Sequence, residues 1–570
     1  MTISSLATQL PPEILQDIVL YLSWKKLPML TTICRSWNRA LIPLLYRSVS
    51  LRGDEQFRLF FDALKTTVSH KQLSQHVREL SISCEGNSAP ALPLQLVQSS
   101  TSNDSTTEKT YIDFLLSLPG MDSLAKITMD GVSYTDPLPS TKFFQDCLTV
   151  LSLDVQAMGN WCDMVTKFRS LQKLSLRFAL RPMQGEISLQ DFEKLHDALI
   201  HLRCFEVTAF SPFGDPPEHI TPCDSVRDLT LSVEACAMWG PYFSRKYTNL
   251  ETLEIDSSRV GSLVCDETKD LLIQSCRQLK TVLVYVGEDY NSFLDVLETA
   301  NAPVRHIQYS FDAHGIIPRT MHSFQQTLAK VQISSCYVSF LELLERLKEC
   351  PCLVDLQLYR ADLEVDRILD ELPGLQHLSL RGCYINVSRQ SNNQGRLHKQ
   401  LRSLELETDE IDWIDGIDNE VFVYLSQYCP CLVSLECRYY NQHNHLPVIY
   451  YPHRSLKHLS VTTYCRSLFK LVRTDDPEVL KQWSKRQYGL ISSIDGERSH
   501  TQWFDVNTRD GPLQPSEAEE IIQDLRDRDE NALYANMTRT RYDRRSDMPI
   551  ISILCRYVDE ITVGLWKVIS

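Results

Sequence analysis

Two Cys-Pro-Cys sequences have the residue spacing that most suggests chemistry, because closely spaced thiolates can bind zinc. They occupy residues 350–352 and 429–431. Yet Cys276, Cys350 and Cys429 each lie three residues before the first leucine of a repeated apolar sequence unit. Other copies of the unit have apolar residues at that position: Phe168, Leu199, Tyr247 and Leu372. A position that apolar residues otherwise fill belongs to a core, so we interpret these thiols as structural.

The remaining candidates for a metal or catalytic site are weaker. Cys437, His443 and His445 lack a fourth ligand at a standard zinc spacing, so we interpret the histidines as loop residues. The acidic run 409–420 lacks calcium-loop spacing and predicts a solvated insertion, with a site for a basic substrate as the alternative. Phosphate-binding-loop, nucleophile-elbow and His-Glu-x-x-His sequences are absent. We therefore expect no catalytic residues, cofactor or metal, while a triad dispersed along the chain stays open.

The composition is that of a globular protein. Of 570 residues, 43% are hydrophobic and 23% are charged. Neither a signal-peptide pattern nor an apolar run of the roughly 18 residues that a membrane span needs is present. Eighteen scattered cysteines fit reduced thiols better than a disulfide framework. We expect a soluble intracellular protein of the cytoplasm, the nucleus or both.

The formal net charge of −15 argues against nucleic acid as the main partner. Binding to a phosphate backbone is driven by clustered Lys and Arg side chains that release counterions. An acidic chain is more compatible with a protein partner, and we expect neither nucleic acid nor a membrane.

An internal repeat organises most of the chain. Its unit is L-x-x-L-x-L, with other apolar residues replacing some leucines. The first apolar residues of its copies lie at positions 77, 124, 148, 171, 202, 226, 250, 279, 304, 328, 353, 375, 401, 432 and 456. After the first gap each step is between 22 and 31 residues, mostly near 24. This spacing is the leucine-rich-repeat period of about 20 to 29 residues.

Each repeat predicts a short strand whose leucines point inward, followed by a turn and a returning helix. One unit cannot bury its own apolar edge, whereas stacked units share a continuous core. We therefore predict an α/β fold: a curved solenoid with parallel strands on its concave face and helices outside.

The repeats divide the chain into three parts. We predict an N-terminal helical domain at 1–48, the solenoid at 49–470 and an irregular C-terminal region at 471–570 that includes a possible cap. Residues 46–51 predict a strand leading into the repeats, and 55–68 an amphipathic helix. A polar stretch at about 84–110 predicts an inserted loop. In the C-terminal region, Ser516 with Glu519 predicts a helix start, and 557–563 returns to the repeat pattern.

The first 48 residues are strongly apolar and carry only seven charged side chains. Pro12 suits a first helical position, and the apolar residues that follow have helical spacing. They predict three short helices, the second of which includes Leu30 and Ile33. Three short helices offer little interior, so part of their apolar surface must face something else. That partner is a second protein or, alternatively, the edge of the repeat array.

This segment resembles the F-box family. The signature L-P-x-E-[IL]-[LI] followed by C-x-x-W is found as Leu10, Pro11, Glu13, Ile14, Leu15, Cys34 and Trp37. Tyr46 followed by a short strand is typical of fungal F-box proteins. Lys25 and Lys26 depart from the family, which commonly has an acidic residue there.

The resemblance implies docking onto the S-phase-kinase-associated adaptor of an SCF-type cullin-RING ubiquitin ligase, and through it onto the cullin and RING subunits. The adaptor-binding residues that it implies are Leu10, Pro11, Glu13, Ile14, Leu15, Ile18, Leu30 and Trp37. An ordinary helix start at Pro12 and Glu13 is the alternative interpretation.

Outward-facing strand residues are the candidates for binding an unknown target protein, because the neighbouring leucines point inward. These candidates are Lys173, Arg177, Asp228, Glu254, Asp256, His306, Lys330, Asp355, Tyr359, His377 and Arg381. We predict a substrate-recognition subunit of a ubiquitin ligase, acting in ubiquitin-dependent protein degradation. The alternative is a leucine-rich-repeat scaffold or assembly protein outside any ligase.

Overall fold

The computed structural model describes a little more than half of the chain and leaves several segments aside. The described residues are 14–15, 27–52, 56, 59–60, 75–83, 124–130, 146–155, 161–178, 186–214, 219–233, 240–256, 264, 266–285, 290–309, 316–334, 340–360, 362–388, 397–408, 417, 419–439, 448–451, 453–463, 468–473, 500–505, 513–514, 516–517, 550–555, 558, 560–563 and 566–569. They divide into two compact units. Unit 1 comprises Met1–Thr281 and Gly287–Ala302, and unit 2 comprises Val282–Val286 and Pro303–Ser570.

Unit 1 begins with helices and continues into strands. Ile14 and Leu15 are helical, and two further helices follow, α3 (Leu27–Leu30) and α4 (Arg35–Leu45). The predicted second helix is shorter than expected, since Thr31–Ile33 form a turn before α4 begins. At the other end of α4 the chain passes through Tyr46 and Arg47 into the first strand.

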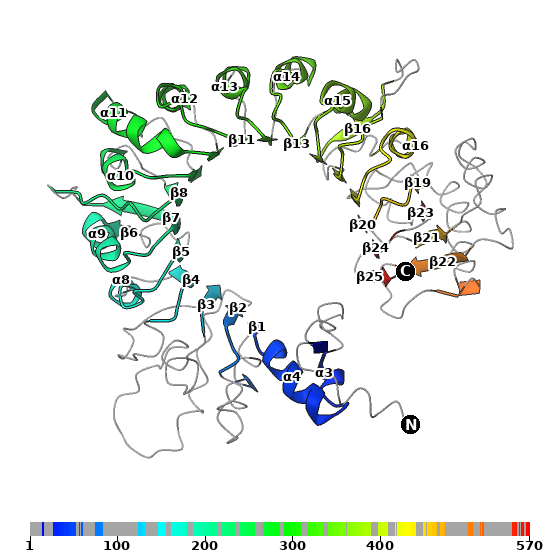
Figure 1. Cartoon of the computed structure of the whole chain (residues 1–570), viewed down its shortest axis with the longest axis horizontal. Helices are drawn as coiled ribbons and strands as arrows, with labels where there is room; N and C mark the ends of the chain where they lie inside the picture. The colour runs from blue at the N-terminus through cyan, green and yellow to red at the C-terminus, as the bar shows by residue number, and fades with distance from the viewer. Residues whose placement is uncertain are drawn as a thin grey trace, which may run out of the picture. The chain divides into compact units, whose positions relative to one another are not determined.

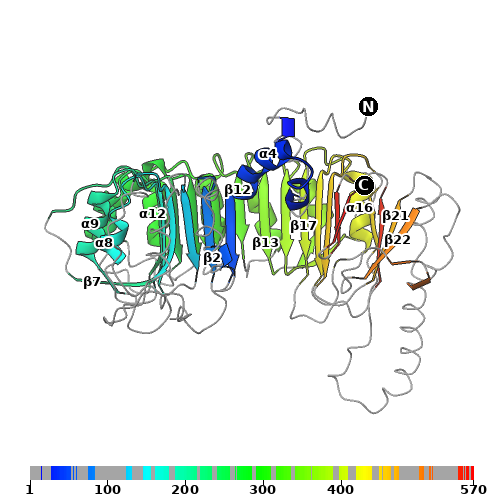
Figure 2. The same ribbon diagram turned by 90° about the horizontal axis from the view of Figure 1, so that it is seen from below.

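Consecutive repeats of unit 1 form a parallel ladder (Figures 1 and 2). Its strands are β1 (Ser48–Arg52), β2 (Glu79–Ser83), β3 (Lys126–Asp130), β4 (Val150–Val155), β5 (Lys173–Phe178), β7 (Cys204–Phe213), β8 (Asp228–Val233) and β9 (Thr252–Asp256). The short β6 (Glu186–Ser188) pairs with the end of β7.

Helices lie on one side of this ladder and leave its other face open (Figure 1). They are α8 (Trp161–Val165), α9 (Leu189–Ala198), α10 (Gly240–Lys246), α11 (Asp266–Ser275) and α12 (Tyr290–Thr299), with a 3₁₀ turn at Cys276–Gln278. We call the open side the strand face.

Unit 2 repeats this arrangement. Its parallel ladder comprises β11 (His306–Tyr309), β12 (Lys330–Ile333), β13 (Asp355–Tyr359), β15 (His377–Arg381), β17 (Ser403–Glu407), β18 (Ser434–Tyr439), β20 (His458–Thr463) and β24 (Glu560–Val563). Its helices are α13 (Ile316–Phe324), α14 (Phe340–Leu347), α15 (Val365–Glu371) and α16 (Asn419–Tyr428). Strand β10 (Thr281–Tyr285) lies where the two units divide.

Unit 2 also contains pairings outside its ladder. The short β14 (Asp362–Glu364) pairs with β16 (Tyr384–Asn386), and β25 (Trp566–Ile569) pairs antiparallel with β24. A separate four-stranded sheet contains β19 (Val448–Tyr451), β21 (Leu468–Arg473), β22 (His500–Asp505) and β23 (Ile550–Cys555).

The predicted α/β leucine-rich-repeat architecture is confirmed, and the repeats explain where each strand begins. In each of the fifteen predicted repeats, the strand starts two residues after the first apolar residue of the repeat unit. For example, β5 starts at Lys173, two residues after Leu171. In β5, Leu174, Leu176 and Phe178 are buried, whereas Lys173 and Arg177 are exposed and the small Ser175 is 9% exposed. This alternation follows from the period of two along a strand.

Other predictions have mixed outcomes. Leu459 of β20 is in register with Ile561 of β24, at the position where the repeat pattern returns. Ser516 is already helical, so the helix includes the residue predicted as its cap, and the backbone N–H of Gln514 donates to Glu517 at 2.8 Å. Of the predicted helix at 55–68, residues 56, 59 and 60 are described and helical. The inserted loop at 84–110 lies outside the described residues.

The cysteines of the repeat position predicted as core are buried. Burial raises the pKa of Cys276 and Cys429 to about 12 and, together with Glu349, that of Cys350 to about 11. A thiol with such a pKa stays protonated at neutral pH, and the thiolate is the form that binds zinc or acts as a nucleophile.

The helical layer of unit 1 contains a buried polar cluster between α9 and α10. Lys246 is 1% exposed and its Nζ lies 2.7 Å from a carboxylate oxygen of Glu193. Beside this pair, His196 places Nδ1 2.6 Å from the carbonyl oxygen of Phe192 and Nε2 3.0 Å from the Tyr247 hydroxyl. Burial, and to a smaller extent Lys246, lower the pKa of His196 to about 4, so its imidazole is neutral.

We expect His196 to make the stability of unit 1 depend on pH. Its ordinary pKa of 6.5 falls to about 4 on folding, so the unfolded chain binds the proton first as the pH falls. The contribution of the neutral, buried His196 to the free energy of unfolding is fully present above pH 6.5 and is lost as the pH falls from 6.5 to 4. Between pH 7 and 5 this loss is about 2 kcal/mol in the free energy of unfolding. Urea unfolding of His196→Gln should lack this component.

The exposed His201 provides the control for this measurement. His201→Gln should keep the full pH dependence of the wild type. If His196→Gln and the wild type lose the same stability between pH 7 and 5, His196 does not carry the effect.

Candidate protein-interaction surfaces

The N-terminal helices form a small interior of their own. Leu15, Trp37, Ala40 and Leu41 are buried against one another. The side chains that pack around this cluster are Leu30, Cys34, Leu44 and Leu45. Helix α4 therefore contributes one apolar face to this interior.

Three large apolar side chains of the same segment remain exposed. Ile14 is 45% exposed, Met29 is 72% exposed and Ile33 is 52% exposed, whereas Leu15, next to Ile14, is 1% exposed. Each side chain has therefore been left out of an interior that its neighbours complete. Such apolar surface is available for contact with another protein.

Hydrogen bonds fix the turn that carries two of these side chains. The Thr32 hydroxyl donates to the carbonyl oxygen of Met29 at 2.6 Å. The backbone N–H of Ile33 donates to the carbonyl oxygen of Leu30 at 3.2 Å. The Asn38 amide donates from α4 to the carbonyl oxygen of Thr31 at 3.2 Å. Hydrogen bonds thus fix Met29, in the last turn of α3, and Ile33, in the turn that follows.

The predicted adaptor-binding residues have different locations. Leu15 and Trp37 lie in the interior and Leu30 packs against it, so these three residues stabilise the helices. Ile14 lies outside the interior and is exposed. The other four predicted residues lie outside the described part of the chain: Leu10, Pro11, Glu13 and Ile18. Sequence reasoning missed Met29, and it wrongly counted Ile33 among the residues of the second helix. The short length of α3, which turns Ile33 outward, carried no sequence signal.

The strand face of unit 1 carries the first group of predicted target-binding residues. Lys173 and Arg177 are exposed on β5. Asp228 and Glu254 are half-buried on β8 and β9, where the Thr230 hydroxyl donates to Glu254 at 3.2 Å. The side chain of Asp256 lies outside the described part.

The strand face of unit 2 carries a network of alternating charges. Arg381 of β15 lies 2.8 Å from Glu405 of β17, and its guanidinium carbon is 5.5 Å from the ring centre of Tyr359 on β13. Arg438 of β18 lies 3.3 Å from Glu405, 3.0 Å from Glu407 and 2.8 Å from Glu436. Two guanidinium groups therefore neutralise much of the charge of three carboxylates.

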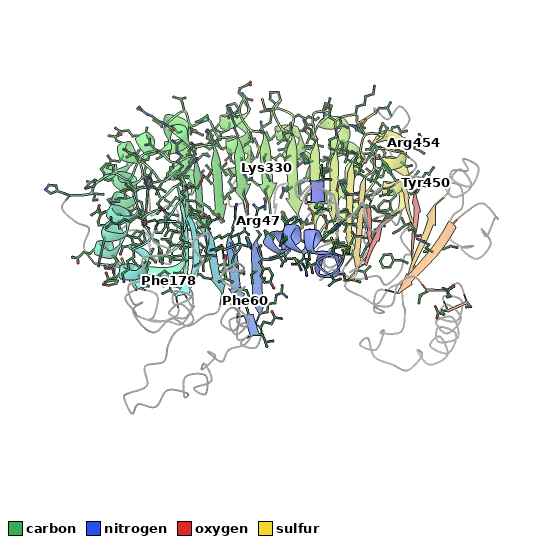
Figure 3. The ribbon with its side chains drawn as sticks, turned by 60° about the horizontal axis from the view of Figure 1, so that its bottom comes forward. Arg47, Phe60, Phe178, Lys330, Tyr450 and Arg454 are labelled. Atoms are coloured by element: carbon green, nitrogen blue, oxygen red, sulfur yellow. The ribbon has the colours of Figure 1, made fainter. Side chains whose placement is uncertain are left out.

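The remaining predicted residues of unit 2 lie at the beginning of its strands. Lys330, on the face seen in Figure 3, is 3.2 Å from Asp355 of the next strand. Burial and then Lys330 lower the pKa of His306 to about 4, so this side chain is neutral at physiological pH. His377 is exposed on β15. The structure thus brings Lys330 and Asp355 together, and likewise Tyr359 and Arg381.

Neither a metal-binding cluster nor a membrane-spanning helix is found in the described part of the chain. Among the described residues, no group of three or more His, Cys, Asp or Glu side chains is placed to hold a metal ion. The described part of the chain likewise contains no helix with the length and apolar character needed to cross a membrane.

Comparison with known families identifies the N-terminal segment. Residues 7–52 match the F-box-like family. These residues form an F-box-like domain. The match begins six residues after the predicted start of the N-terminal domain at residue 1 and ends four residues beyond its predicted end at residue 48. It includes the signature from Leu10 to Trp37, the interior around Trp37 and strand β1, which is the first strand of the repeat ladder.

Comparison with solved structures gives a remote likeness for the repeats. One match is titled "Crystal structure of TLR13-ssRNA13 complex"; it is 13% identical, with a TM-score of 0.39. It covers 68% of this chain and 60% of that chain. Among curated proteins, none matches this chain.

We expect Glu405 to stabilise the network on the strand face of unit 2. Its side chain is 15% exposed and contacts both Arg381 and Arg438. Glu405→Ala removes a carboxylate that contacts the guanidinium groups of both Arg381 and Arg438 in a partly buried site. This loss of negative charge should lower the free energy of unfolding by about 1–3 kcal/mol. Denaturant unfolding of the purified chain measures this change.

Glu436→Ala is the matched control, because Glu436 contacts Arg438 alone of the two arginines and is 34% exposed. It should cost less than about 1 kcal/mol. Equal losses for the two variants would contradict a central role for Glu405.

Proposed function

We propose that this protein is a substrate-recognition subunit of an SCF-type E3 ubiquitin ligase. The F-box-like domain would bind the S-phase-kinase-associated adaptor, and the leucine-rich repeats would bind a target protein. The observation that carries the proposal is the F-box-like segment at 7–52 with Ile14, Met29 and Ile33 exposed outside its completed interior.

The division between buried and exposed residues fits an adaptor-docking role. Trp37 and Leu41 hold α4 in place, and the exposed apolar side chains supply the surface that a partner covers. Full burial of a side chain such as Ile or Met contributes roughly 1.5–3 kcal/mol. Three such residues are sufficient to form the centre of an interface in which a few side chains contribute most of the binding energy.

The proposed contribution to ubiquitin transfer is proximity. Binding the target through the repeats and the adaptor through the F-box-like domain raises the effective concentration of target lysines beside the charged ligase. This role needs no catalytic residue, cofactor or metal on the chain itself. Its partners would be the adaptor, the cullin and RING subunits reached through it, and one target, in the cytoplasm, the nucleus or both.

Capture of the adaptor tests this proposal. We expect the full chain to bind the purified adaptor, and the triple variant Ile14→Glu, Met29→Glu, Ile33→Glu to lose binding by at least about tenfold, since each change places a charge in an apolar contact. The three side chains are already exposed, so the variant should unfold at the same urea concentration as the wild type. Isothermal titration calorimetry measures both affinities.

Ile200→Glu is the matched control, because Ile200 is 65% exposed on unit 1 outside the F-box-like segment. It should bind the adaptor like the wild type. Failure of the wild-type chain to bind would favour the alternative of a repeat scaffold outside any ligase.

A further inference from the structure

A line of cationic side chains follows one edge of the strand face in unit 1. Its members share a place at or just before the first residue of a strand, and we call them the basic edge: Arg47, Arg78, Lys126, Lys173 and Arg203. Figure 3 shows Arg47 near the start of this ladder, where α4 leads into β1. All five side chains are exposed.

Backbone hydrogen bonds align these residues from strand to strand. The carbonyl oxygen of Arg47 accepts from the N–H groups of Arg78 and Glu79 at 2.9 and 3.0 Å, and that of Arg78 accepts from Lys126 at 3.0 Å. The carbonyl oxygen of Gln172 accepts in the same way from Arg203 at 2.8 Å. Because this pattern repeats through the ladder, the basic edge occupies two adjacent rows across strands about 4.8 Å apart, with no member at β4.

The basic edge has little compensating negative charge among the described residues. Its five side chains form no ion pair with any described residue, and the two rows at the strand starts from β1 to β7 contain one carboxylate, Glu79, which accepts a hydrogen bond from Ser48 at 3.4 Å. The chain as a whole has a formal net charge of −15. A local excess of positive charge on an acidic protein therefore attracts anions selectively to this edge.

The basic edge ends where carboxylates return. Beyond β7, Glu251 contacts both Arg227 and Lys280, and these two cations lower the pKa of Glu251 to about 2. Asp228 and Glu254 lie on the neighbouring strands. Arg227, just before β8, and Lys280, just before β10, are thus already paired with Glu251, which limits the available positive edge to the span from β1 to β7.

Small hydroxyl side chains lie beside the basic edge, one step further along each strand. They are in register from β1 to β5: Ser50, Ser81, Thr128, Ser152 and Ser175. Ser50 is exposed, Ser81, Thr128 and Ser152 are half-buried, and Ser175 is buried. A chain lying across the first four strands would therefore meet hydroxyl donors beside the cationic groups.

We propose that the basic edge binds an extended, unphosphorylated acidic segment of the target protein. Five intervals of about 4.8 Å span about 24 Å, which an extended peptide covers with about seven residues. The inference rests on the proposed function, because it names the class of target segment that the repeats would hold. Since Arg47 follows α4 directly, it also places that segment next to the F-box-like domain.

The spacing of the cations favours carboxylates over a phosphate group. Phosphate sites gather several donors around one group. Here the cations are distributed along the ladder, at most one for each strand, as a row of separate carboxylates requires. Nucleic acid is disfavoured because phosphate-backbone binding requires dense positive charge, whereas this chain is acidic overall.

Direct binding of a defined peptide tests the inference. The probe is a fluorescein-labelled peptide of alternating Glu and Ser, about twelve residues long, titrated with the full chain at low salt and followed by fluorescence anisotropy. Arg78→Glu with Lys173→Glu should weaken binding by at least about tenfold, and salt should weaken wild-type binding because exposed charges are screened. A peptide with Gln in place of Glu should not bind.

Arg305→Glu with Lys457→Glu is the matched control, since both residues are exposed, lie just before ladder strands of unit 2 and form no ion pair with described residues. This control should bind the probe within twofold of the wild type. Absence of wild-type binding, or equal weakening by both double variants, would overturn the inference. So would preference for the same peptide with phosphoserine, or for an oligouridine RNA of the same length.

Adaptor capture with the same preparations separates this inference from the proposed function. Arg78→Glu with Lys173→Glu should bind the adaptor normally, because these changes lie outside the F-box-like segment. Loss of peptide binding with retained adaptor binding supports the inference. If the wild type fails to bind the adaptor but still binds the peptide, the ligase role is rejected. The basic edge then remains a binding site for an acidic segment.

Discussion

The structure depends on the fact that one repeat cannot bury its own apolar edge. Leu174 and Leu176 of β5 are fully buried because the strands on both sides supply matching apolar residues, Leu151 and Leu153 from β4 and Phe205 and Val207 from β7. Removing one strand would expose the edges of two others. This mutual dependence fixes the register of each ladder and commits alternate side chains to the opposite, solvent-facing side.

The same constraint explains why so much of the fold was predictable. A strand with an inward period of two, repeated about every 24 residues, leaves little freedom in strand position, so the start of β5 after Leu171 followed from the pattern alone. Within the F-box-like segment the pattern was less informative. Apolar residues such as Leu15 and Ile14 are adjacent in sequence and similar in type, yet one is buried and the other exposed.

Contacts between repeats could not be predicted from the sequence to the same extent. Glu405 and Arg438 are 33 positions apart, and their pairing depends on side chains crossing from β17 to β18. The register shows which residues are neighbours, but it does not show which rotamers they adopt. For the same reason the neutral state of His196 required the structure, because it results from burial between α9 and α10.

Charge compensation distinguishes the strand faces of the two units. In unit 2, Arg381 and Arg438 are already held by carboxylates, so a charged partner must break existing ion pairs before it gains new ones. In unit 1, Arg78 and Lys173 are exposed and form no ion pair with a described residue, so there is no such pair for a charged partner to break first. Because both ladders bury the same pattern of apolar residues, the outward residues alone decide whether the cations of a given strand are paired with carboxylates. Repeat architecture thus allows binding chemistry to vary along the chain without a cost to the core.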